Sequence, residues 1–129
     1  MRQSFTFALA LLGGIAAWPA SAHHSFAIFD FSTQIPYEGV VETLDFRNPH
    51  IAMTLKVRGE DGSEQIIDFI EGAPANMLAR TGLRPEMIAP GTKISTLASP
   101  LREDPSKYFL RVIILEDGAA YDGVARPQR

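Results

Sequence analysis

Residues 51–58 alternate apolar and polar side chains without interruption, and a turn-forming Gly-Glu-Asp-Gly sequence follows them. Successive side chains of a strand point to opposite faces, so one face of this segment is apolar and the other polar. The pattern predicts a half-buried strand that opens a hairpin, and therefore a chain built largely from strands. The side chains expected in the core are Ile51, Met53, Leu55 and Val57.

The rest of the chain contains further strand-like stretches and one stretch of helical character. Pro74 suits the first turn of a helix, and Gly82 is a typical stop after its last turn. The expected elements are strands over residues 37–46, 51–58, 64–70, 93–98 and 108–115, and a helix over residues 74–81.

Alternation also predicts the two faces of the strand at residues 37–46. One face is expected to carry Val40, Glu42, Leu44 and Phe46, and the other Val41, Thr43 and Asp45.

The two ends of the chain are expected to lie outside these strands. Residues 23–34 are rich in aromatic side chains and are expected to add an edge strand or to pack as an arm. Residues 119–129 are expected to form a loose tail.

Three strands, one helix and two strands follow one another in this order. The order matches a five-stranded Greek-key barrel of the oligonucleotide/oligosaccharide-binding (OB) type, which carries its helix between the third and fourth strands. A small open sandwich with one helix is the alternative. We expect the barrel, as a single domain over residues 23–118, because one short helix fits its capping position.

The first 22 residues have the pattern of a secretory signal peptide. Arg2 provides a positive start, an apolar run follows, and Ala20-Ser21-Ala22 forms a small-x-small cleavage site. The apolar run is shorter than the roughly 20 residues that span a bilayer. We therefore expect cleavage after Ala22, no membrane span after cleavage, and a periplasmic or secreted protein that begins at His23.

Composition excludes several classes of function. The chain of 129 residues contains no cysteine, which excludes disulfides, a thiol nucleophile and zinc–thiolate sites. Its formal net charge is −3 at pH 7, so it has no basic field for nucleic acid. The sequence shows neither a pair of carboxylates with an acid–base division nor a nucleophile–base arrangement. We therefore expect a protein that is not an enzyme.

Several short motifs resemble those of a family of uncharacterised exported bacterial proteins, whose mature chains begin His-His-Ser and carry an Asn-Pro-His turn. The resemblance implies export and a shared fold, and it implies no activity. The motifs are His23-His24-Ser25-Phe26, Phe29-Asp30, Gly39-Val40, Asn48-Pro49-His50, Pro90-Gly91, Arg111-Val112 and Asp117-Gly118.

All three histidines are candidate metal ligands: His23, His24 and His50. An N-terminal His23 offers its α-amine and its ring Nδ1 as one chelate, and His50 adds a further nitrogen. Such nitrogen donors favour Cu(II) among the divalent first-row metals. The alternative is that the terminal histidines are solvated and that His50 caps a turn.

The sequence thus leaves two main functional hypotheses. The first is an exported, non-catalytic binding protein whose ligand is a small molecule, a glycan or an envelope protein. The second is a periplasmic copper-binding protein that uses the mature N-terminal histidine. Fold alone does not choose between them.

Overall fold

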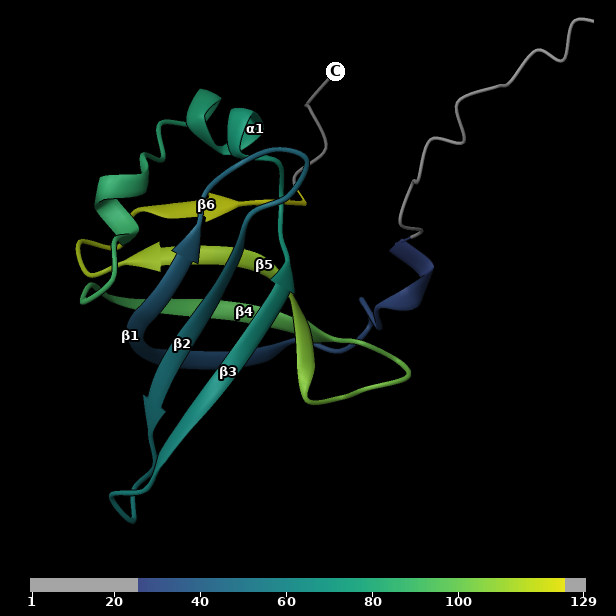
Figure 1. Cartoon of the computed structure of the whole chain (residues 1–129), viewed down its shortest axis with the longest axis vertical. Helices are drawn as coiled ribbons and strands as arrows, with labels where there is room; N and C mark the ends of the chain where they lie inside the picture. Colours follow the sequence, from purple (N-terminus) through teal and green to yellow (C-terminus); the bar gives the residue numbers. More distant parts are fainter. Residues whose placement is uncertain (1–25, 125–129) are drawn as a thin grey trace, which may run out of the picture.

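Five strands close into a barrel in the computed structural model, which describes residues 26–124 (Figure 1). Antiparallel pairs join β1 to β2 and to β4, β2 to β3, and β4 to β5, and a parallel pairing of β3 with β5 closes the barrel. The expected OB-like barrel is confirmed. Its strands are β1 (Ile35–Asp45), β2 (Ala52–Arg58), β3 (Glu64–Glu71), β4 (Lys93–Pro100) and β5 (Lys107–Leu115).

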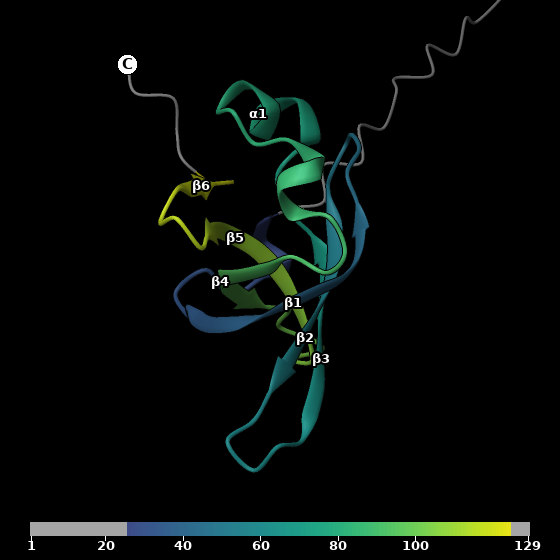
Figure 2. The same cartoon turned by 90° about the vertical axis from the view of Figure 1, so that its left-hand side faces the viewer.

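The connection between β3 and β4 contains the helix α1 (Ala75–Arg80) and the 3₁₀ helix η2 (Pro85–Ile88). Figures 1 and 2 place α1 at one end of the barrel and the β2–β3 hairpin at the other. Pro74 precedes the first turn, and Gly82 follows the last with a φ of 98°, a conformation that glycine adopts without strain. Both sequence-based predictions for the ends of the helix are confirmed.

The core lies inside the barrel and under α1. Ile51, Met53 and Leu55 are at most 2% exposed, and Val57 is half-buried against the same cluster, so the register expected for β2 is confirmed. Leu78 of α1 is buried in this cluster. The helix therefore covers the end of the barrel with its apolar side.

The faces expected for β1 are only partly right. Val40 and Leu44 were expected on the same face of the strand. Val40 is instead 40% exposed, whereas its neighbour Val41 is 1% exposed. The pairing of β1 with β2 shifts between Val41 and Thr43, which is a β-bulge at Glu42. The extra residue reverses the alternation, so that Val41 and the half-buried Leu44 both pack on the core.

Two segments lie outside the barrel: the C-terminal one differs from the expectation, and the N-terminal one packs as an arm, which was one of the two expected alternatives. Residues expected in a loose tail form β6 (Ala120–Asp122), which pairs with β5 beyond the point where β3 leaves it. The N-terminal segment packs as an arm: it begins with η1 (Phe26–Ile28), and Phe29 forms an isolated bridge with Leu101. Between residues 26 and 124, no helix is long and apolar enough to cross a membrane.

Candidate functional site

The Asn-Pro-His segment connects β1 to β2 and is tied to the chain that follows β3. Oδ1 of Asn48 accepts a hydrogen bond of 3.1 Å from the backbone N–H of Asn76, in the first turn of α1. The N–H of Ile51 donates to the carbonyl of Ala73 at 3.1 Å. The peptide bond between Asn48 and Pro49 is cis. These two hydrogen bonds fix the position of His50, which lies between them in the sequence.

Both ring nitrogens of His50 face oxygen atoms at the end of β3. Nδ1 lies 3.1 Å from the carbonyl oxygen of Gly72, and Nε2 lies 3.4 Å from Oε1 of Glu71. A carbonyl only accepts hydrogen bonds, so Nδ1 carries a proton. The His50 side chain is 32% exposed and the Glu71 side chain is 11% exposed.

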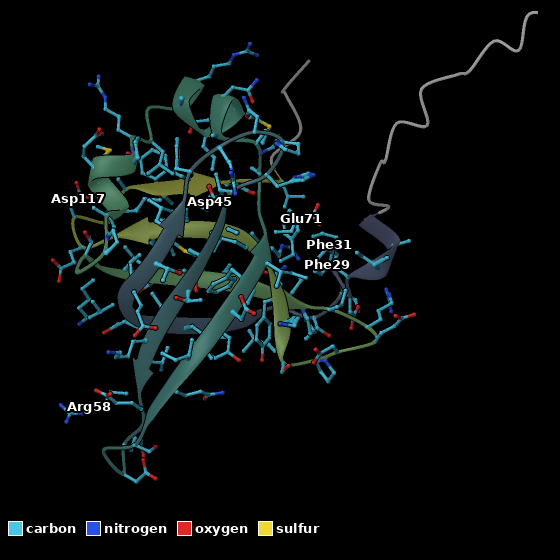
Figure 3. The ribbon with its side chains drawn as sticks, in the orientation of Figure 1. Phe29, Phe31, Asp45, Arg58, Glu71 and Asp117 are labelled. Atoms are coloured by element: carbon cyan, nitrogen blue, oxygen red, sulfur yellow. The ribbon has the colours of Figure 1, made fainter. Side chains whose placement is uncertain are left out.

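Glu71 is the residue of this site that the sequence argument did not single out. It is 8% exposed, whereas its strand neighbours Ile66 and Ile70 are 47% and 38% exposed. A signal was present in the sequence: Glu71 continues the alternation of the buried residues Ile67 and Phe69. Figure 3 shows Glu71 at the end of β3.

The other two predicted ligands, His23 and His24, lie outside the described residues. In the range 26–124, no three His, Cys, Asp or Glu side chains gather as a metal site. The structure therefore brings His50 together with Glu71, and it does not test the meeting of His50 with the N-terminal histidines.

The N-terminal arm packs against β5. Phe31 contacts Phe109 at 5.1 Å between ring centroids, and Phe109 is the residue of β5 that pairs with Glu71. Nη1 of Arg111 donates to the carbonyl of Phe31 at 2.9 Å and its guanidinium lies over the ring of Phe31. The arm thus packs on β5, the strand that pairs with the end of β3 at Glu71.

Asp30 organises the turn of this arm. Its carboxylate accepts hydrogen bonds from the hydroxyls of Ser32 and Thr33, which together lower the pKa of Asp30, with a smaller contribution from the charge of Arg102. The ion pair with Arg102, 3.6 Å apart, links the arm to the loop between β4 and β5. The carboxylate is therefore committed to the local structure of this turn.

A second candidate surface is the side of β1, β2 and β3 that points away from the core, and we call it the outer face. The strand registers align Val40, Lys56 and Ile66 in one row across the sheet. Val40 and Ile66 are 40% and 47% exposed, and Ile70 is 38% exposed on the same side of β3. In OB folds, the face around the second and third strands is the usual ligand-binding surface.

A shallow depression of about 290 Å³ adjoins the outer face. Its lining includes Val40, Lys56 and the turn at Pro90 and Gly91. The N–H of Gly91 donates to the carbonyl of Val41 at 2.8 Å. Gly39 lies beside it, where a Cβ atom would come within 2.3 Å of the carbonyl oxygen of Lys56. Only glycine allows β1 and β2 to approach this closely.

Comparison with known families agrees with the resemblance in the sequence. A family model described as a family of unknown function, DUF6152, matches residues 12–108. The chain belongs to this family. No curated protein and no solved structure matches the chain. The matched range of the DUF6152 chain includes His50, Glu71 and the outer face, so both candidate surfaces belong to the part that defines the family.

Proposed function

We propose that the protein is exported and acts as a non-catalytic binding protein whose ligand contacts the outer face. The observation that carries this proposal is the row of Val40, Lys56 and Ile66, in which two exposed aliphatic side chains flank a cation. Exposed apolar groups that cluster on one face commonly mark interaction sites. The ordinary ligand position of OB folds supports the same surface.

Export is supported by the leader pattern of residues 1–22. Intact mass of the protein from the cell-envelope fraction tests it. A mass that begins at His23 is expected, whereas a mass that still includes Met1 to Ala22 would contradict the proposed cleavage.

The ligand can be tested without knowing its class. A photo-reactive amino acid at Ile66 should form a covalent adduct in cells, and the intact mass of the recovered chain separates a small molecule, a glycan and a protein. The same probe at Ile28, which is 38% exposed on the arm, is the matched control. Recovery of only unmodified chain from the Ile66 probe would contradict the proposal.

A second function, copper binding, is favoured by the geometry of His50. Histidine ligands of metals usually donate their other ring N–H to a carbonyl or carboxylate, which fixes the ring and its tautomer. Nδ1 of His50 makes this bond to Gly72, and Nε2, which lies 3.4 Å from Oε1 of Glu71, is the ring nitrogen that would bind an ion. In this proposal His50 binds Cu(II) together with the α-amine and ring of His23, and His24 is the alternative terminal ligand.

The chelate formed by His23 provides the test of this second function. One residue added before His23 turns the α-amine into an amide and should severely weaken Cu(II) binding in a calorimetric titration. His50→Ala should weaken it less, because the chelate remains. Binding should also weaken as pH falls, because the ligands must lose their protons. Unchanged affinity in the extended chain would contradict the use of the N-terminal histidine.

A further inference from the structure

One edge of β3 is free over the first half of the strand. β2 pairs with β3 from Glu64 to Phe69, but β5 pairs with it only from Asp68 onward. Between residues 26 and 124, no other strand pairs with β3, so residues 64–67 have a partner strand on one side alone. This half lies in the β2–β3 hairpin, which extends beyond the rest of the barrel (Figures 1 and 2). A strand edge of this kind presents unpaired N–H and C=O groups to an extended chain.

The hairpin determines which backbone groups point to the free edge. The N–H of Gly59 donates to the carbonyl of Ser63 at 2.8 Å, which makes these two residues a hydrogen-bonded pair. Hydrogen-bonded and non-hydrogen-bonded pairs alternate in an antiparallel ladder, so the backbone groups of Gln65 point to β2. The N–H and C=O groups of its neighbours Glu64 and Ile66 therefore point the other way, into the free edge.

The side chains beside this edge suit a polypeptide better than a sugar or a nucleobase. Ile66 is the most exposed aliphatic side chain of the outer face, at 47%. The only aromatic side chain of β2 and β3 is Phe69, which is buried, so these strands offer no ring on which a flat ligand could stack. An added strand fits both features, because its backbone pairs with Ile66 while its alternate side chains cover the aliphatic group.

Charge indicates what the added strand carries. Residues 58–64 contain three carboxylates and one cation, and Glu64 is exposed at the edge. A lysine or arginine beside Glu64 complements this charge. A second copy of the chain fits poorly: two antiparallel copies paired at Ile66 would place Glu64 directly opposite Asp68 of the other copy, and like charges in this position destabilise a sheet.

We propose that a partner protein adds an extended strand to the free edge of β3, hydrogen-bonded to the backbone of Glu64 and Ile66. The inference rests on the binding proposed above for the outer face, and it names the ligand of that face as a protein. The added strand extends the row of Val40, Lys56 and Ile66 with an aliphatic side chain, and it carries a cation beside Glu64.

Photo-reactive amino acids placed singly at Glu64 and at Ile66 test this arrangement in cells. Both should cross-link to one short segment of one protein, at positions about two residues apart, because neighbours on the same face of a strand are two residues apart. Mass spectrometry of the cross-linked peptides gives these positions. Cross-links to scattered segments, or to a second copy of the chain, would contradict the proposal.

A proline tests the hydrogen bond at the edge. Ile66→Pro removes an N–H that points to the free edge and leaves the ladder with β2 in place. It should lower the cross-link yield from Glu64 about fivefold or more, because a carbonyl group of the added strand loses its donor. Ile66→Ala is the matched control: it removes more aliphatic surface than proline does but keeps the N–H. A loss with Ala that equals or exceeds the loss with Pro would contradict backbone pairing.

Amide hydrogen exchange of the unaltered, isolated chain checks the edge itself. The N–H groups of Glu64 and Ile66 should exchange fast and that of Gln65 slowly, whereas equal protection of all three would show that the edge is not free. The identity of the adduct separates the two proposals. A small molecule or a glycan attached at Ile66 would contradict the added strand and leave binding at the outer face standing, and recovery of unmodified chain alone would contradict both.

Discussion

The backbone N–H of Asn76 donates a hydrogen bond to Oδ1 of Asn48, 28 residues earlier in the chain. The first N–H groups of a helix lack partners inside the helix, and a side-chain oxygen that satisfies one of them stabilises the helix. Here the cap comes from the loop between β1 and β2. The Asn-Pro-His segment therefore joins α1 to the barrel, whatever else His50 binds.

This joint predicts a specific loss of stability. Asn48→Ala should lower the free energy of unfolding by about 0.5–2 kcal/mol, as the loss of other helix caps does. Asn48→Asp keeps an acceptor oxygen and should recover most of the loss. Denaturant titration of the two variants measures the difference, and equal destabilisation by Ala and Asp would show that the cap does not contribute.

The inner and outer faces of β2 predict a contrast between neighbouring residues. Leu55 is fully buried, and Leu55→Ala should cost about 2–5 kcal/mol, as large-to-small changes in cores do. Lys56 points outward and pairs with Glu42 at 3.4 Å, a half-exposed ion pair. Lys56→Ala should therefore cost at most about 0.5 kcal/mol. Similar losses in a denaturant titration would show that the register of β2 is different.

The bulge at Glu42 predicts the opposite behaviour of two adjacent valines. Val41→Thr places a hydroxyl in the core and should cost about 1–3 kcal/mol, while the same change at the exposed Val40 should stay within about 0.5 kcal/mol. Uninterrupted alternation from Leu44 would place Val40 inside and reverse the result. Thermal or chemical unfolding of the two variants decides between the two arrangements.

The arm predicts a pH dependence at Asp30. Hydroxyl hydrogen bonds from Ser32 and Thr33 lower the pKa of Asp30 in the folded protein. The contribution of Asp30 to stability is therefore fully present above the ordinary pKa of an unfolded aspartate, about 3.9, and is lost as pH falls through the lower folded value.

NMR titration of the Asp30 carboxyl carbon checks this direction. Its pKa should lie below the ordinary value and should rise in Ser32→Ala, which removes the largest contribution. Ser63→Ala, which removes the equivalent hydroxyl partner of Asp61 in the β2–β3 hairpin, should leave the pKa of Asp30 unchanged. A pKa of Asp30 that Ser32→Ala does not alter would contradict the assigned cause.

The sequence by itself determined the strands, their order and the position of the helix. These features depend on residues close in the chain: alternation along Ile51 to Val57, the turn after Arg58, and the proline and glycine that bound α1. The order of the elements was enough to predict an OB-like barrel, because few topologies place one helix between the third and fourth of five strands.

Only the tertiary structure decided which side chains meet. The bulge in β1 arises from its pairing with β2, so no local pattern shows that Val40 faces outward. β6 exists because β5 continues past the end of β3 and leaves an edge to pair. His50 and Glu71 lie 21 positions apart in the sequence. The hydrogen bonds of Asn48 and Ile51 with the chain that follows β3 place one beside the other. Such contacts depend on non-local pairing, which the periodicity of a single segment does not encode.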